Sequence, residues 1–216
     1  MSLPLLAHQK DPMAAIRVGG VENPLRVLVS GCIAGEPCGT DGTDYGLGNC
    51  LGDLLKLKSL KVFSFCPEAA GIGVPRNMPD IHGGDGFTVL DGKAQVLDEH
   101  DNNLTEQIVN GCRAMLEFAK QSQIELAILT DMSAACGSQV ISKGCRLVKK
   151  REFLASVGIA TALLLREGIP VVSQRDFQTL ALLRQHLCPK ESIRLGLLDH
   201  HRTEWFENYF LQVSGG

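Results

Sequence analysis

Four short apolar runs rich in β-branched side chains constrain the fold of this chain more than any other feature. They cover residues 26–30, 61–65, 125–130 and 169–173. Runs of this length and composition are typical of buried β-strands. Helix-like patterns separate the runs, and strands that alternate with helices form mostly parallel sheets covered on both faces. The sequence therefore predicts an α/β fold with a three-layer, Rossmann-like arrangement around a mostly parallel sheet.

The predicted helices rest on periodic apolar positions and on cap residues. The strongest covers residues 104–121, where apolar side chains recur on one face and Asn103 can cap the first turn. Gly168 is expected to end another helix. Pro170 favours an edge position for the fourth strand, because proline cannot donate a hydrogen bond to the ladder. The remaining helices are expected at residues 49–58, 152–167, 177–186 and 203–212.

A small β-hairpin insertion is predicted between the second and third strands. Two apolar stretches, residues 87–90 and 94–97, flank Asp91 and Gly92. An Asp-Gly pair favours the type I′ turn that joins hairpin strands. Residues 69–86 are rich in glycine and proline, so we expect an irregular loop there.

The length of the chain suits one globular domain with short appendages. It has 216 residues, of which 44% are hydrophobic. We expect an N-terminal arm at residues 1–23, poorly ordered or packed on another subunit, and a globular body at residues 24–190. A helical extension is expected at residues 191–216, and its aromatic side chains favour docking on the body or on a partner chain. A homodimer is therefore a candidate assembly.

The charge and hydropathy of the chain disfavour several classes of function. The net charge is −3, the pI is about 6.1, and charges of both signs are interspersed. Binding to a nucleic acid polymer is therefore not expected, although a single base or nucleoside remains compatible. No stretch approaches the ~20 apolar residues of a membrane span. The N-terminal residues do not resemble a secretory signal, so a cytoplasmic location is expected.

The chain contains eight cysteines, and their spacing limits what they can do. Without a secretory signal, thiols or metal ligands are favoured over disulfides. No two cysteines are spaced C-x-x-C, which removes the zinc ribbon, the thioredoxin motif and the ferredoxin-type run. Any metal site must therefore be built from cysteines that are far apart in the sequence.

Three cysteines follow three of the predicted strands. Cys32, Cys66 and Cys136 come after the first, second and third strand. The carboxyl ends of parallel strands lie at one edge of a sheet, where ligands bind in folds of this kind. Thiolates without regularly spaced histidine or aspartate favour soft metals, namely iron–sulfur clusters, zinc or Cu(I). Three ligands rather than four would leave one metal position open for a substrate.

Other interpretations of the cysteines remain open at this stage. Cys38 lies in the same loop as Cys32, where it can be a fourth ligand, a redox partner or neither. A metal-free thiol enzyme would use Cys32 or Cys136 as its nucleophile. The remaining cysteines are expected to be small apolar fillers or bystanders: Cys50, Cys112, Cys145 and Cys188.

Four segments resemble the motifs of a bacterial family that includes the thiouracil desulfidases. The family pattern V-S-A-C-L-L-G-x-x-C-x-x-x-G is similar to VSGCIAGEPCGTDG at residues 29–42. Its C-P-E motif is similar to residues 66–68, its S-P-S-C-G motif to residues 133–137, and its G-x-P-R motif to residues 73–76. The resemblance covers about residues 25–175. The departures are Gly31 for alanine, Ala34 for leucine, and Ala134 and Ala135 for Pro-Ser.

The resemblance implies an enzyme with a [4Fe–4S] cluster held by Cys32, Cys66 and Cys136. The iron without a protein ligand would act as a Lewis acid toward the sulfur of a thiolated pyrimidine base or nucleoside, or of a related small thio-compound. The reaction would be non-redox, with sulfide released and oxygen taken from water. Glu68 and Ser133 match polar positions near the cluster. Glu68 is the candidate general base, with Asp41 behind it.

A second function of a different class fits the same thiols. A binding or sensing protein without catalysis could use them to hold zinc or a labile iron–sulfur cluster.

Overall fold

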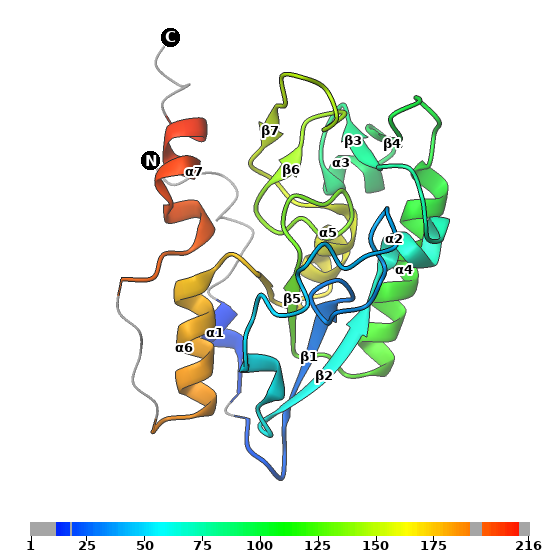
Figure 1. Cartoon of the computed structure of the whole chain (residues 1–216). Coiled ribbons are helices and arrows are strands. Elements are labelled where there is room, and N and C mark those ends of the chain that lie inside the picture. Colours follow the sequence, from blue (N-terminus) through cyan, green and yellow to red (C-terminus); the bar gives the residue numbers. More distant parts are fainter. Residues whose placement is uncertain (1–11, 18, 191–195, 212–216) are drawn as a thin grey trace.

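The computed structural model describes residues 12–17, 19–190 and 196–211 (Figure 1). Its centre is a four-stranded parallel sheet with the order β2-β1-β5-β8. The strands are β1 (Leu25–Ser30), β2 (Leu60–Phe65), β5 (Leu126–Leu129) and β8 (Val171–Ser173). All four predicted strands are present, and β8 occupies an edge of the sheet, as the proline before it predicts.

The register of the strands brings three loops to one edge of the sheet. Ser30, the last residue of β1, pairs with Phe65, the last residue of β2. On the other side of β1, Val29 pairs with Ile128, one residue before the end of β5. The loops that follow these strands therefore start side by side, although they lie about one hundred residues apart in the sequence.

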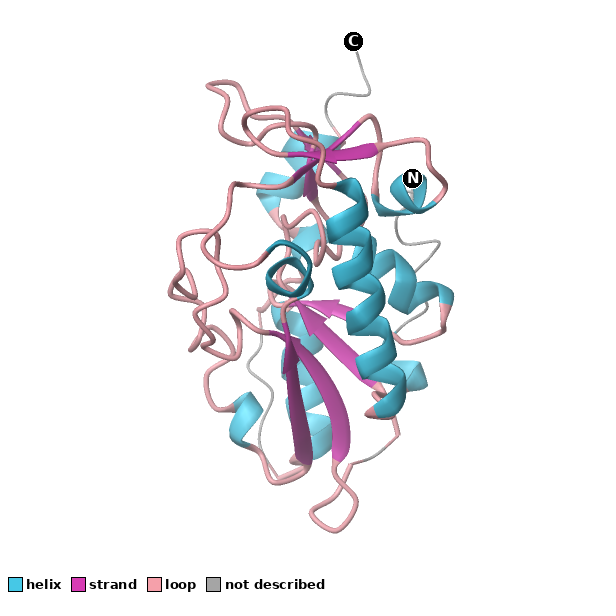
Figure 2. Ribbon diagram, turned by 90° about the vertical axis from the view of Figure 1, so that its right-hand side faces the viewer, coloured by secondary structure: helices cyan, strands magenta, loops and turns pink. Residues whose placement is uncertain are grey.

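Helices cover both faces of the sheet, which makes the three-layer arrangement (Figure 2). On one face Leu28 and Leu129 pack in a core with α4 (Thr105–Gln121) and α5 (Ile159–Arg166). On the other face Val27, Val29 and Ile128 pack in a core with α6 (Phe177–Leu187) and the short 3₁₀-helix η2 (Leu54–Lys56). Alternate strand residues supply the two cores, because successive side chains of a strand point to opposite faces.

Helix α4 has the apolar face that its sequence predicts. Its buried residues are Ile108, Val109, Gly111, Cys112, Met115, Leu116 and Ala119. Cys112 is fully buried among them, in agreement with a role as an apolar filler. The predicted cap is one position early. The carboxamide oxygen of Asn103 accepts from the Thr105 N–H at 3.0 Å, and Leu104 is the N-cap residue.

A small antiparallel pair of strands lies between β2 and β5, as predicted, but residues 87–90 are not one of its strands. Residues Gly86–Leu90 form the helix α3, and β4 (Gln95–Leu97) pairs instead with β3 (Asp80–His82). Asp85 caps α3 through a reciprocal pair of bonds with Thr88. This capping box satisfies free N–H groups of the first turn and outweighs the β propensity of the segment.

Two further segments differ from the prediction. The expected helix at residues 49–58 is mostly turns, with only η2 helical, and Gly52 adopts a φ of 55°, which interrupts a helix. The expected loop at residues 69–86 contains most of α2 (Pro67–Ile72) as well as β3. A proline at the first position of a helix is the local signal for α2.

The expected helix at residues 152–167 starts later than predicted. Phe153–Leu154 is the short strand β7, which pairs with β6 (Ile141–Ser142), and α5 begins only at Ile159. Gly158 has an extended backbone that precedes the helix.

The C-terminal part of the chain folds against the body. It contains η3 (His200–Arg202) and α7 (Glu204–Phe210), and the His200 N–H bonds to Asp176 at the start of α6 (Figure 1). The short helix α1 (Pro12–Ala15) packs against α6. Residues 1–11 and 18 of the expected N-terminal arm, and residues 191–195 and 212–216 of the expected extension, lie outside the described residues. The three segment boundaries and the homodimer stay predictions. No helix in the described part of the chain combines the length and apolar character needed to cross a bilayer.

Candidate functional site

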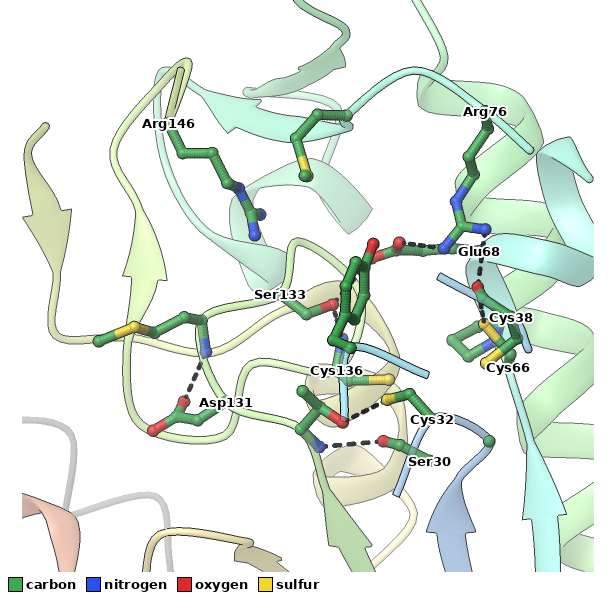
Figure 3. A pocket seen from close by; sticks show the side chains of 16 residues that line it. Ser30, Cys32, Cys38, Cys66, Glu68, Arg76, Asp131, Ser133, Cys136 and Arg146 are labelled. Carbon is green, nitrogen blue, oxygen red and sulfur yellow. Dashed lines mark hydrogen bonds and ion pairs between the residues drawn. The ribbon is translucent and has the colours of Figure 1, made fainter. Parts of the chain in front are cut away.

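A cavity of about 270 Å³ opens at the carboxyl edge of the sheet (Figure 3). The three cysteines that follow β1, β2 and β5 all line it, and Cys38 lies beside them. Glu68 and Ser133 line the same cavity. The structure therefore brings five of the six predicted site residues to one place, from segments that are up to one hundred residues apart.

Cys32 begins the loop after β1 and is almost fully buried. Its Sγ lies 2.9 Å from the hydroxyl oxygen of Thr130, the residue that follows β5. A hydrogen bond from the Cys38 thiol is the largest influence on Cys32 and, with the bond to Thr130, lowers the pKa of Cys32 to about 7 despite its burial. Cys32 is therefore close to the thiolate form near neutral pH.

Cys66 is the N-cap residue of α2. Its Sγ accepts a hydrogen bond from the Ala69 N–H at 3.4 Å, so the thiol points toward the first turn of the helix. The pKa of Cys66 is lowered, first by a hydrogen bond with Cys38 and also by the Ala69 N–H and by the charge of Arg76. Both lowered pKa values favour the form that binds metals.

Cys136 lies in a tight turn of small residues after β5. Its N–H donates to the Ser133 hydroxyl oxygen at 3.0 Å, and its carbonyl oxygen accepts from the Thr161 hydroxyl at 3.0 Å. Burial raises the pKa of Cys136 well above its ordinary value, so this thiol is protonated when no metal is bound.

Cys38 joins the predicted ligands at the cavity, so four thiols meet there rather than three. Its thiol lies between Cys32 and Cys66 and makes hydrogen bonds with both, which raises the pKa of Cys38. The absence of a side chain at Gly31 leaves room for this arrangement. A Cβ at Gly31 would lie 2.6 Å from Glu36 Oε2, 3.0 Å from the Cys38 Sγ and 3.4 Å from the Cys66 Cβ.

The sulfur atoms of the cavity cysteines are not close enough together to bind one metal ion. Among the described residues, the group of metal-binding atoms that all lie within 4.8 Å of one another consists of Asp176, Asp199 and His201, and it contains no cysteine. Three thiolates on a single zinc ion, with Zn–S bonds of about 2.3 Å, would lie within roughly 4 Å of one another. The cysteines are therefore spread more widely than one zinc ion requires.

A chain of polar contacts connects Glu68 to the Cys136 turn. The Ser133 hydroxyl donates to Glu68 Oε1 at 2.8 Å, and Arg76 Nη2 donates to Glu68 Oε2 at 2.8 Å. The side chains of Glu68 and Arg76 are 13% and 4% exposed, so the ion pair is buried. Arg76 Nη1 also donates to the carbonyl oxygen of Cys38 at 2.8 Å. The carboxylate of Glu68 is thus fixed at both oxygens beside the cysteines.

Asp41 is the predicted site residue that the structure does not bring to the cavity. It lies in an exposed loop, where its carboxylate accepts from the N–H and the hydroxyl of Thr43. These bonds lower the pKa of Asp41, and the residue does not line the cavity.

Sequence reasoning missed several residues that line the cavity. Tyr45, Met78, Met132 and Arg146 line it as well. Arg146 is held by Asp80, with its Nε donating to Asp80 Oδ1 at 2.7 Å. These residues sit in loops without a helix or strand period, so no pattern in a single sequence marks them.

A parallel sheet with thiols and a fixed carboxylate around a cavity at its carboxyl edge is the architecture of an α/β enzyme, and the thiol-lined cavity is its candidate active site. Comparison with known families identifies the family within this class. The model of the 2-thiouracil desulfurase family matches residues 27–176, and the chain belongs to this family. The match contains every cysteine at the cavity and ends before η3 and α7.

Two similar proteins agree with this membership. An uncharacterized protein of Bacillus subtilis (strain 168), YbbK, is 31% identical over 151 residues, which are 69% of this chain and 96% of YbbK. A solved structure of TudS, a [4Fe–4S]-dependent thiouracil desulfidase, is 30% identical with a TM-score of 0.60. The alignment covers 74% of this chain and 97% of TudS. About a quarter to a third of this chain lies outside each of these alignments.

Proposed function

We propose that this chain is a [4Fe–4S]-dependent desulfidase. It would replace the sulfur of a thiolated pyrimidine base or nucleoside, or of a related small thio-compound, with oxygen from water. Family membership and the likeness to TudS support the class of reaction. The observation that carries the proposal is the convergence of three strand-end thiols on one cavity, beside a buried carboxylate.

Cys32, Cys66 and Cys136 would hold the cluster. Thiolates are the usual ligands of iron–sulfur clusters. The lowered pKa values of Cys32 and Cys66 favour this role. Cys136 has a raised pKa because it is buried, and a bound metal would deprotonate it, since coordination removes the proton of a thiol. The donor set therefore fits an iron–sulfur cluster.

The separation of the sulfurs favours a cluster over the zinc alternative. A single zinc ion needs its thiolates within roughly 4 Å of one another, and the cavity cysteines do not form such a group among the described residues. A multi-iron core bridges wider separations, because each thiolate binds a different iron. A zinc-binding sensor is therefore the weaker candidate.

When bound, the cluster would supply an open, Lewis-acidic iron for the sulfur of the substrate. The chain's own contribution is to activate and orient water. Glu68 would take a proton from water as it attacks the carbon of the C=S group, and Ser133 would hold Glu68 in place through its 2.8 Å hydrogen bond. The balance is R₂C=S + H₂O → R₂C=O + H₂S, so neither an oxidant nor a reductant is required.

The cavity suits a small, flat substrate. Its volume of about 270 Å³ lies just below the range of roughly 300–1,000 Å³ that is usual for ligand pockets. Tyr45 and the thioether of Met78 offer surfaces for the faces of a ring, and Arg146 offers N–H groups for a carbonyl oxygen. A polymer of nucleotides would not enter such a cavity.

Anaerobic reconstitution with iron and sulfide tests the proposal. We expect a brown protein with about four irons per chain, which releases sulfide from 2-thiouracil. Cys136→Ser should lose both the iron and the activity. Cys188→Ser, which changes a cysteine at the end of α6 away from the cavity, should keep both. A colourless wild-type protein with stoichiometric zinc would overturn the cluster. Unchanged iron in Cys136→Ser would overturn the ligand assignment.

A further inference from the structure

The loop that carries Ser133 and Cys136 is closed by one carboxylate. Oδ1 of Asp131 accepts hydrogen bonds from four backbone N–H groups across this loop, at distances from 2.9 to 3.1 Å. The donors are Met132, Ser138, Gln139 and Val140. Asp131 thus joins the two ends of residues 132–140, and Figure 3 shows it below the turn that leads to Cys136.

The other oxygen of Asp131 has its short contact with the C-terminal segment and a longer one, of 3.4 Å, with the Ser173 hydroxyl. His200 Nδ1 lies 2.6 Å from Asp131 Oδ2, and the two residues are 3% and 4% exposed. A carboxylate can only accept, so Nδ1 carries the proton of this bond. Burial raises the pKa of Asp131, but the hydrogen bond and the charge of His200 outweigh that effect and keep the pKa below its ordinary value.

The position of His200 is itself fixed by the segment that contains it. Its ring stacks on Trp205 at 5.4 Å between centroids and meets Phe206 edge-on at 5.7 Å. Its backbone N–H donates to Asp176 at 3.1 Å, next to the start of α6. The family match ends at residue 176, so His200 and the aromatic residues of α7 lie beyond it.

We propose that His200 is a positioning residue for the active site. Through His200, the C-terminal segment (residues 196–211) holds the loop of Ser133 and Cys136 in the conformation that receives the cluster. The hydrogen bond of His200 completes the set of donors around Asp131, and Asp131 holds the backbone of the loop. This inference rests on the proposed function for the role of Cys136, but not for the contact itself.

Amide hydrogen exchange in the cluster-free protein tests the contact directly. His200→Leu removes the Nδ1 donor to Asp131 Oδ2. The four N–H groups bound to Asp131 should then exchange about 10-fold faster or more, as expected for the loss of a hydrogen bond to a charged group. His200→Asn should restore slow exchange, because its amide nitrogen can occupy the place of Nδ1. His200→Gln should not, because its longer side chain carries the amide past that place.

Tyr209→Phe is the matched control. Tyr209 is another polar contact of the same segment with the body, since its hydroxyl oxygen accepts from the Phe153 N–H at 2.9 Å, but it does not touch Asp131. Its loss should leave exchange at residues 132–140 unchanged. If His200→Leu fails to fold, the comparison of His200→Asn with His200→Gln decides. Equal exchange in these two variants, or wild-type exchange in a folded His200→Leu, would overturn the proposal.

The rate of iron loss from reconstituted protein to a chelator gives a second readout. His200→Leu should lose iron about 10-fold faster or more than wild type, with Tyr209→Phe unchanged. Accelerated exchange in a protein that never binds iron would leave the positioning role of His200 standing and refute the proposed function. Wild-type exchange and iron loss in a folded His200→Leu would refute the role of His200 alone.

Discussion

Replacement of Glu68 separates the structural role of this residue from its proposed catalytic role. Glu68→Ala leaves the Arg76 guanidinium, which is 4% exposed, without its carboxylate. Breaking a buried ion pair in this way typically costs about 3–5 kcal/mol. Arg76 keeps hydrogen bonds to the carbonyl oxygens of Cys38, Gly39 and Gly73, so we expect the lower end, about 3 kcal/mol. For a chain of this size that lowers Tm by roughly 6–12 °C.

Glu68→Gln should behave differently. Its amide can still meet the Arg76 guanidinium and the Ser133 hydroxyl, but it cannot accept a proton from water. We expect a smaller change in Tm, retention of iron, and a fall in kcat for sulfide release of roughly 10²- to 10⁴-fold, as for the loss of a general base.

Thermal denaturation of the cluster-free protein and sulfide release from the reconstituted protein measure the two effects. Asp91→Ala is the matched control for stability, because its ion pair with Arg166 is exposed on both sides and should be worth less than about 1 kcal/mol. If Glu68→Ala lowers Tm no more than Asp91→Ala does, the ion pair between Glu68 and Arg76 contributes less to stability than about 3 kcal/mol. If Glu68→Gln releases sulfide at the wild-type rate, Glu68 is not the base.

Three further predictions concern other parts of the molecule. Cys38→Ala should retain about four irons per chain, because three thiolates are the proposed ligands, and a loss of iron equal to that in Cys136→Ser would make Cys38 a fourth ligand. Gly31→Ala places a Cβ 2.6 Å from Glu36 Oε2 and 3.0 Å from the Cys38 Sγ. It should cost about 1–3 kcal/mol of stability by overpacking, measured by denaturant unfolding. Unchanged stability would mean that the side chains around Gly31 adapt freely. Burial raises the pKa of Asp176 to about 7, so the folded state binds the proton more tightly, and stability should fall as the pH rises from about 4 through 7. Asp176→Asn should reduce that fall in Tm, and an identical pH profile would show that another group causes it.

The sheet and the convergence of the cysteines could be predicted because both depend on strong local signals. Short β-branched runs mark the strands, and a parallel sheet then brings the residues that follow them to one edge. Cys32, Cys66 and Cys136 are about thirty and seventy residues apart, yet only the strand pattern was needed to bring them together. Glu68 and Ser133 were expected at the site because they match polar positions of the family motifs, and each lies within three residues of one of these cysteines.

Other features depend on contacts that no short pattern contains. The residues that form α3 have β propensity, and the capping bonds between Asp85 and Thr88 decide in favour of a helix. Arg76 reaches Glu68 through a loop with a cis bond before Pro75, and the bond between Asp131 and His200 spans 69 residues. Asp41 lies within the family motif at residues 29–42 but in an exposed loop, so its place in the motif alone did not bring it to the cavity.

Mössbauer spectroscopy of anaerobically reconstituted protein tests the central claim most directly, namely that Cys32, Cys66 and Cys136 together hold one four-iron cluster. Three protein ligands leave one iron different from the other three. We predict one cluster per chain, in which a single iron site changes its parameters when 2-thiouracil is added, and no such spectrum in Cys136→Ser. Four equivalent irons that do not respond to 2-thiouracil would contradict the claim, as would the same spectrum in Cys136→Ser.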